Sequence, residues 1–236
     1  MLRLVIAVFL SVAFISPSAS ADEKSVRDLF SARFHGIKPE SVTRMPIGGL
    51  YEIVFEGQIV YTDEKMSYIM SGNLIDLRSG NERNLTRERT MQIAADALAK
   101  SQNYAIKRVK GTGKRVIYTF EDPNCAYCKQ LQKELNKIND VTIYTFLWPI
   151  LSPDSVEKSK AIWCAKDRAR AWDDAMNKAI VPMGSKDCQT PLEKNMQMAQ
   201  RFGMHGTPAV YLANGQQIGG YLPADKLEQA LTSVTR

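Results

Sequence analysis

Two cysteines separated by two residues, Cys125 and Cys128, are the residues whose type and spacing point most directly to chemistry. They stand between an apolar run at 116–120 and a helical pattern at 129–135. A strand, a tight turn and a helix that begins at the first cysteine are the setting of a thiol–disulfide redox pair. Because a helix N-terminus favours an anion, we expect Cys125 to be the attacking thiolate and Cys128 the resolving thiol.

The same pair has two other interpretations, half of a structural zinc site or an ordinary disulfide. Zinc takes four ligands, usually from a second Cys-x-x-Cys or a pair of histidines. The other cysteines, Cys164 and Cys188, are far apart, and the histidines, His35 and His205, are not paired. We therefore predict redox chemistry, with no metal and no cofactor.

The first 21 residues have the pattern of a secretory signal peptide. A short basic start is followed by an apolar run at 4–15, and the small residues at 18–21 offer a cleavage site. An uncleaved membrane anchor is the alternative, and the small residues argue against it. We expect the mature chain to begin at Asp22 and to enter the periplasm. No later segment is long and apolar enough for stable membrane insertion.

Composition limits the classes of partner. The net charge is +6 and is spread along the chain, so basic runs such as 107–110 are expected to be solvated faces. Nucleic acid is therefore not expected as a partner. Four cysteines suit an oxidising compartment, but they are too few to staple a small fold, so hydrophobic cores must hold it.

The elements that position these residues fall into three parts. From 22 to about 83 we expect one helix at 25–34 and then strands. The expected strands are 50–55, 58–61, 68–70 and 74–77, the last two continuing one sheet around Gly72. So small a unit buries little surface alone, which suggests pairing with a copy of itself. Residues 84–103 indicate an exposed helix that joins two domains rather than a core element.

The third part runs from about 104 to 236 and carries the cysteines. After the Cys-x-x-Cys helix we expect a strand at 141–146, a long helical insertion, a strand at 208–212 with a hairpin, and a last helix at 224–234. This order is thioredoxin-like topology. Pro208 supports it, because a proline cannot donate to a strand ladder and must stand at its start or edge.

Three segments together resemble the bacterial periplasmic protein disulfide isomerase family of the DsbC/DsbG type. They are FEDPNCAYC at 120–128, AIWCAKD at 161–167 and GTPAV at 206–210. The resemblance implies an α+β fold with a cystatin-like N-terminal dimerisation domain at 22–83 and a linker helix at 84–103. A C-terminal thioredoxin-like catalytic domain with a helical insertion would follow at 104–236. The family also implies a V-shaped homodimer whose thioredoxin-like domains face an open cleft.

The resemblance assigns further residues. Cys164 and Cys188 match the second, structural disulfide of the DsbC branch, which DsbG-type relatives usually do not have. Thr207 and Pro208 match a cis peptide that packs against the active cysteines and forms a floor for substrate. Between those cysteines the chain has Ala126 and Tyr127, where the DsbC branch typically has Gly-Tyr and DsbG-type relatives Pro-Tyr.

Gly72 is our candidate for the dimer interface, because an exposed strand edge is a template for another chain. A bulge inside one domain is the alternative reading of this glycine.

Charged residues near the cysteines give a weaker pattern. Thioredoxin-like redox domains often have a buried acid six residues before the first cysteine, a position that Thr119 occupies here. We expect Glu121 and Asp122, which are closer in sequence, to be partly solvated at the end of their strand. His205 lies near Pro208, where its protonated form would stabilise a thiolate; a solvated loop histidine is the alternative.

The implied function is a periplasmic thiol–disulfide isomerase and reductase. Reduced Cys125 would attack wrong disulfides in misfolded exported proteins and form a mixed disulfide. Keeping Cys125 reduced requires an electron source, which by resemblance is a membrane reductase of the DsbD type. Two other functions stay open, and the first can coexist with isomerisation: a holdase chaperone, and a DsbG-like reductase of sulfenylated cysteines.

Overall fold

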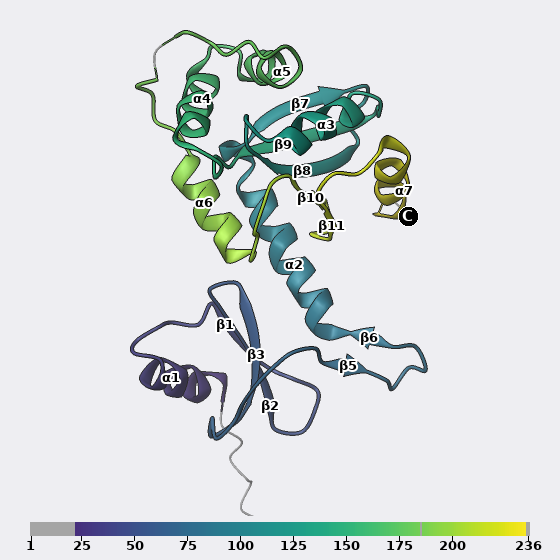
Figure 1. Ribbon diagram of the computed structural model, residues 1–236. Helices are drawn as coiled ribbons and strands as arrows, with labels where there is room; N and C mark the ends of the chain where they lie inside the picture. Colours follow the sequence, from purple (N-terminus) through teal and green to yellow (C-terminus); the bar gives the residue numbers. More distant parts are fainter. Residues whose placement is uncertain (1–21, 185, 235–236) are drawn as a thin grey trace, which may run out of the picture. The chain divides into compact units, whose positions relative to one another are not determined.

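The computed structural model describes residues 22–184 and 186–234, so the expected signal peptide lies outside the described residues. The chain forms two compact units. Of the described residues, one unit holds 22–55 together with Val60–Met70, and the other holds Glu56–Ile59 and those from Ser71 onward. The elements of both are labelled in Figure 1.

The first unit packs one helix on a small sheet. Helix α1 (Glu23–Arg33) begins after Asp22, whose carboxylate accepts the Ser25 N–H at 2.7 Å and caps the helix. The sheet has the order β1-β2-β3-β4. Its strands are β1 (Ser41–Arg44), β2 (Leu50–Phe55), β3 (Gln58–Asp63) and β4 (Ile69–Ser71). Val26 and Phe30 of α1 are fully buried with Tyr51 and Ile53 of β2, so the helix closes one face of the sheet.

The expectation that residues 74–77 continue this sheet is wrong. Gly72 follows β4 with a φ of +136°, a conformation that only glycine adopts without strain, and the chain turns away there. Strand β5 (Ile75–Asp76) then pairs with β6 (Arg83–Asn84) in a separate two-stranded sheet. The bend at Gly72 is therefore the physical reason for the difference.

Helix α2 (Leu85–Lys100) corresponds to the expected linker helix, but it is not exposed throughout. Asn84 caps it by accepting the Arg87 N–H at 2.8 Å. Ala94 and Leu98, one turn apart, are buried against aromatic side chains of the large sheet. The second half of α2 is thus part of a core, because small and aliphatic residues recur at that spacing. A short 3₁₀ turn, η1 (Gln102–Tyr104), follows it.

The second unit is built on a five-stranded sheet with the order β11-β10-β8-β9-β7. Its strands are β7 (Ile106–Lys110), β8 (Arg115–Glu121), β9 (Val141–Leu147), β10 (Ala209–Leu212) and β11 (Gln217–Gly219). Strands β8 and β9 are parallel and the other pairs are antiparallel. The helices are α3 (Ala126–Leu135), α4 (Pro153–Cys164), α5 (Arg168–Lys178), α6 (Leu192–Arg201) and α7 (Ala224–Val234). This is the thioredoxin-like arrangement with a helical insertion between β9 and β10.

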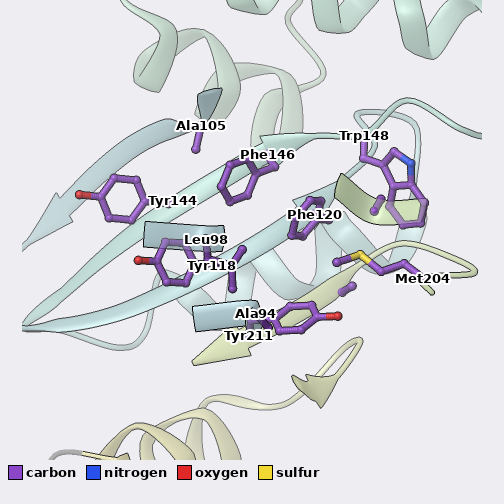
Figure 2. Close-up of a cluster of buried hydrophobic side chains, with 12 residues drawn as sticks. Ala94, Leu98, Ala105, Tyr118, Phe120, Tyr144, Phe146, Trp148, Met204 and Tyr211 are labelled. Carbon is purple, nitrogen blue, oxygen red and sulfur yellow. The ribbon is translucent and has the colours of Figure 1, made fainter. Parts of the chain in front are cut away.

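The two faces of this sheet differ in chemistry. One face is aromatic: Phe120 of β8 and Phe146 of β9 stack with ring centroids 4.7 Å apart, and Tyr211 of β10 meets Phe120 edge-on (Figure 2). Since side chains alternate along a strand, the neighbours of Phe120, Thr119 and Glu121, lie on the opposite face. That face is covered by α3 and α7. Strand β8 therefore delivers polar side chains beneath the helix that carries the active cysteines.

The basic run at 107–110 is not a solvated face. It forms β7, at the edge of the sheet, and only alternate side chains point to solvent. Val109 is exposed, whereas Arg108 is 8 % exposed. The Arg108 guanidinium donates to Gln132 of α3 at 2.6 Å and to Asp173 of α5 at 2.9 Å. An expected surface charge is thus a buried hydrogen-bond donor.

Candidate active site

Cys125 lies at the start of α3, as its sequence context predicts. It is the N-cap residue of the helix, and its Sγ accepts the backbone N–H of Cys128 at 3.2 Å. The sulfur therefore occupies the place that a capping oxygen takes in most helices. Cys125 is 5 % exposed, whereas Cys128 has no exposed surface. Both are free thiols, and of the two only Cys125 keeps any exposed surface.

A second segment, 82 residues further along the chain, meets Cys125. The peptide bond between Thr207 and Pro208 is cis. The Thr207 carbonyl lies 3.3 Å from Cys125 Sγ and accepts its hydrogen bond when Cys125 is protonated. The Thr207 hydroxyl is buried and has no other hydrogen-bond partner among the residues that the structure describes. The strand that Pro208 precedes thus places one backbone acceptor and one free hydroxyl beside the reactive sulfur.

These contacts separate the acidities of the two thiols. Hydrogen bonding from the Cys128 side chain is the largest cause that lowers the pKa of Cys125, to about 6, and it outweighs burial. The Thr207 hydroxyl and the backbone N–H groups of Cys128 and Tyr127 lower that pKa further. Burial raises the pKa of Cys128, and the neighbouring Cys125 and Glu121 add to the rise. At neutral pH Cys125 is a thiolate and Cys128 a protonated thiol, which is the asymmetry that disulfide exchange requires.

Asp122 holds the loop that leads to Cys125, and the expectation that it is partly solvated is wrong. Its side chain is fully buried. It accepts hydrogen bonds from the backbone N–H groups of Asn124, Ile150 and Leu151 at 2.7–3.0 Å and from the Ser155 hydroxyl at 2.8 Å. The start of α4 and the segment before it cover the end of β8 and exclude water. Asp122 therefore ties the cysteine loop to residues 150–151 and to the start of α4.

Glu121 is also fully buried, so the same expectation is wrong for this residue. Its two carboxylate oxygens accept hydrogen bonds from Gln132 Nε2 at 2.7 and 2.8 Å. Burial raises the pKa of Glu121 to about 7, while Arg108 counteracts the rise. Glu121, Gln132 and Arg108 form a polar cluster under α3 that the sequence did not reveal as a group.

The other candidate residues lie at several places. Ala126 and Tyr127 are exposed in the first turn of α3, with Tyr127 61 % exposed. His205 is exposed in the loop before the cis-proline. Gly72 lies at the end of β4, in a different part of the chain from the cysteines. The residues that the structure describes contain no group of three or more His, Cys, Asp or Glu side chains that could hold a metal.

Cys164 and Cys188 are joined by a disulfide, with Cα atoms 5.7 Å apart. The bond links the last residue of α4 to the segment that precedes α6. Beside it the Trp163 indole N–H donates to the Gln189 carbonyl at 3.1 Å, and the Arg168 guanidinium lies 3.9 Å from the Trp163 ring centroid. This second cysteine pair therefore fastens the helical insertion.

Two family models match the chain. A model described as the disulfide bond isomerase protein N-terminal domain matches residues 17–87, and a thioredoxin-like domain model matches 102–235. Among the helices of the described residues, none has the length and apolar character of a membrane span.

Curated relatives and one solved structure agree with these models. A probable thiol:disulfide interchange protein DsbC from Bordetella parapertussis is 40 % identical over 217 residues, which is 92 % of this chain and 76 % of the relative. The thiol:disulfide interchange protein DsbC of Escherichia coli K12 is 28 % identical over 95 % of this chain and 93 % of the relative. The crystal structure of a disulfide interchange protein from Neisseria gonorrhoeae is 40 % identical. It has a TM-score of 0.54 and covers 56 % of this chain and 96 % of that chain.

Proposed function

This chain belongs to the DsbC family of thiol:disulfide interchange proteins, and from that membership we propose that it isomerises and reduces wrong disulfides in exported proteins. The observation that carries the proposal is the asymmetry of the two thiols. Cys125, which is 5 % exposed, has a pKa of about 6, and Cys128 behind it has no exposed surface and is protonated. We place the activity in the periplasm, with residues 1–21 as a cleaved signal peptide.

The proposed reaction begins with attack of the Cys125 thiolate on one sulfur of a substrate disulfide. The substrate S–S bond breaks, a mixed disulfide forms with Cys125, and the other substrate sulfur leaves as a thiolate. If a different substrate thiol then attacks the mixed disulfide, the substrate is isomerised and Cys125 is regenerated. If Cys128 attacks instead, the substrate leaves reduced and the cysteine pair is oxidised. A membrane reductase of the DsbD type would then return two electrons to the pair.

Apolar side chains beside the sulfur support binding of unfolded polypeptide, and hence chaperone activity. Tyr127, Ile150 and Leu151 are all at least 40 % exposed. Tyr127 is two residues from Cys125, and the backbone of Ile150 and Leu151 is bonded to Asp122 of the cysteine loop. Unfolded substrates expose apolar residues, so a surface of this kind beside the reactive sulfur suits them.

A homodimer through the N-terminal unit is part of the proposal. Strand β4 is the last strand of its sheet, and its Ile69 and Met70 are 43 % and 50 % exposed. An exposed apolar edge is a template for pairing with another chain. We expect Met70→Lys to give monomers in analytical ultracentrifugation that reduce disulfides but isomerise them poorly. Gly72 is a poorer site for this test, because its φ of +136° would strain any side chain. A dimeric Met70→Lys protein would move the interface away from β4.

The test of the function is refolding of a scrambled multi-disulfide protein by the purified protein supplied reduced. Wild type should restore activity of the scrambled protein in catalytic amounts, and Cys125→Ser should not. If Cys125→Ser prevents aggregation of the unfolded substrate but does not isomerise it, the protein has a holdase function that needs binding and no redox chemistry. If reduced wild type restores no activity but reduces a sulfenylated single-cysteine protein, the DsbG-like function replaces this one.

A further inference from the structure

We propose that Glu121 is the internal base that takes the Cys128 proton when Cys128 resolves the mixed disulfide, with Gln132 and Arg108 as the residues that position it. The inference rests on the proposed function, since it concerns the step in which Cys128 attacks Cys125. It assigns a role to the buried polar cluster under α3.

In the resolving step Cys128 must lose its proton before it can attack the mixed disulfide. Only a thiolate attacks a disulfide, and Cys128 is a protonated thiol with no exposed surface. Bulk water cannot reach its proton. Asp122 is a poor acceptor, because each of its carboxylate oxygens already accepts two hydrogen bonds, from Asn124, Ile150, Leu151 and Ser155, whereas Gln132 donates only one to each oxygen of Glu121. The base must therefore be another buried group close to Cys128.

Glu121 is placed for this role by the strand and by the helix. The backbone N–H of Cys125 donates to the carbonyl of the next residue, Asp122, at 3.0 Å, so the end of β8 is held against the start of α3. The charge of Glu121 also raises the pKa of Cys128. From the helix, Gln132 is four residues after Cys128, which puts both side chains on the same inward face of α3. Both are fully buried, and Gln132 donates to both oxygens of Glu121. The carboxylate is thus held beneath the turn of helix that contains Cys128.

Arg108 fixes the direction of the Gln132 amide. Its Nη1 donates to Gln132 Oε1 at 2.6 Å, so the amide nitrogen must face Glu121. Its Nη2 donates to the Thr145 hydroxyl at 3.1 Å. The guanidinium carries a positive charge into the cluster without touching the carboxylate, because the glutamine stands between them. This arrangement keeps Glu121 available for a proton instead of locking it in an ion pair.

The charges that face Glu121 set its affinity for a proton. They come from Arg108 on β7, which is paired with Asp173 of α5, from Cys125 at the N-cap of α3, and from Cys128 within that helix. Burial raises the pKa of Glu121 to about 7, Arg108 lowers it, and the Cys125 charge raises it. A general base works best when its pKa is near the operating pH, and this balance puts Glu121 there.

The resolving step moves one proton and exchanges one S–S bond for another. Glu121 takes the proton of Cys128, and the Cys128 sulfur forms a bond to Cys125 Sγ while the bond from Cys125 to the substrate sulfur breaks. The substrate leaves as a thiolate and is protonated by solvent. The cysteine pair has then given two electrons to the substrate. When the reductase reduces the pair again, Glu121 returns the proton to Cys128.

The experiment uses the reduced full-length protein and an aromatic disulfide whose released thiol is coloured, Ellman's reagent, in a stopped-flow instrument. Attack by Cys125 releases the first coloured thiolate at a rate that depends on concentration. Attack by Cys128 releases the second at a rate that does not. For wild type we expect the second rate to rise through about pH 7 and then level off. For Glu121→Gln we expect a second phase roughly 100-fold slower at neutral pH that rises with pH without levelling, and a first phase within about threefold of wild type.

Two further variants keep the test decisive. Glu193→Gln removes an exposed carboxylate on α6 and should behave as wild type. Gln132→Met removes the donor to Glu121, so the levelling point should move to higher pH, which loss of packing alone would not do. A Glu121→Gln protein, folded by its melting temperature, whose second phase keeps the wild-type rate and pH profile overturns the inference. If the wild-type protein shows no first phase, Cys125 does not attack disulfides and the proposed function itself fails. That result differs from an unchanged second phase in Glu121→Gln, which overturns only this inference.

Discussion

The chain has two cysteine pairs, and their first members lie at opposite ends of helices. Cys125 is the N-cap of α3, where free N–H groups and the helix dipole stabilise an anion. Cys164 is the last residue of α4, where the dipole disfavours one. Cys125 and Cys128 are free thiols, and Cys164 is bonded to Cys188. The position of the cysteine in its helix, rather than the residue itself, separates a reactive sulfur from a structural one.

The residues around the two cysteine pairs also differ. The Cys125–Cys128 pair has a hydroxyl, a buried acid and backbone donors beside it, all of which shift the pKa of one of the two thiols. Cys164 and Cys188 lie beside the Trp163 ring and the Arg168 guanidinium stacked on it, which hold the segment in place. The second bond closes a loop with a sequence separation of 24, a length that the chain-entropy model makes worth about 3 kcal/mol. The first pair should therefore matter for rate and the second for stability.

The largest expected effect comes from changing the reactive sulfur. Cys125→Ser should abolish disulfide reduction and isomerisation, because a serine hydroxyl is not ionised at neutral pH and does not attack disulfides. Cys128→Ser should keep the attack and accumulate mixed disulfides with substrate, since the resolving thiol is lost. Turnover with a scrambled substrate and mass spectrometry of the trapped species measure the two results. Selective alkylation of Cys128 at neutral pH would reverse the roles.

The next effect should appear in stability and not in rate. Replacing Cys164 and Cys188 together by alanine should reduce the free energy of unfolding by about 3 kcal/mol, through loss of the loop constraint on the unfolded chain. Turnover per folded molecule should stay within about twofold, because neither sulfur is among the groups that bond Cys125 or Cys128. Urea unfolding followed by activity below the transition measures both.

The matched control for that double variant is Cys125→Ser with Cys128→Ser, which should remove activity. Compared at pH 6, where the Cys125 thiolate adds little stability, it should leave the unfolding midpoint of the reduced protein nearly unchanged. Loss of turnover in the alanine variant, in protein shown to be folded, would make the second pair part of the redox path. Free thiols at Cys164 and Cys188 in protein taken from its native compartment would show that the two residues do not form a structural disulfide there.

The redox motif was predictable because it depends on local structure. A strand, a turn and a helix between Arg115 and Leu135 place Cys125, and short-range patterns report such elements well. The structure also places Thr207 and Pro208 beside Cys125, but only the resemblance indicated it, because the segments are far apart in the sequence.

The polar cluster was not predictable for the opposite reason. Glu121 ends a strand that is buried on both faces, so no alternation marks its side chain as internal or external. Arg108 stands in a basic run, and its side chain is buried only because that run forms the edge strand β7, with alternate side chains facing inward. A single sequence does not show that the run is a strand of this sheet. Gln132 was the available signal: it is four residues after Cys128 and adjacent to Leu131, on the face of α3 that must pack inward.

The smallest effect tests the hydroxyl beside the reactive sulfur. Thr207→Val keeps the carbonyl that contacts Cys125 and removes the hydroxyl that lowers the pKa of Cys125. A single hydrogen bond is worth about 1 kcal/mol net, so that pKa should rise by less than about 1 unit. The measurement is the pH midpoint of Cys125 alkylation. Thr190→Val is the matched control, since Thr190 also precedes a proline but lies outside the cysteine site.

The lowered pKa of Cys125 also predicts how the stability of the reduced protein changes with pH. Folding lowers the pKa of Cys125 from 9.0 to about 6, so the thiolate stabilises the reduced protein fully above pH 9 and loses that contribution as the pH falls through about 6. The oxidised protein has no thiol at this position and should not show the trend. In Thr207→Val the difference in melting temperature between pH 9 and pH 6 should shrink for the reduced form only. An equal pH dependence in reduced and oxidised wild type would mean that the helix start and the cis-proline segment do not hold Cys125 as a thiolate. The contrast between the two cysteine pairs would then rest on access alone.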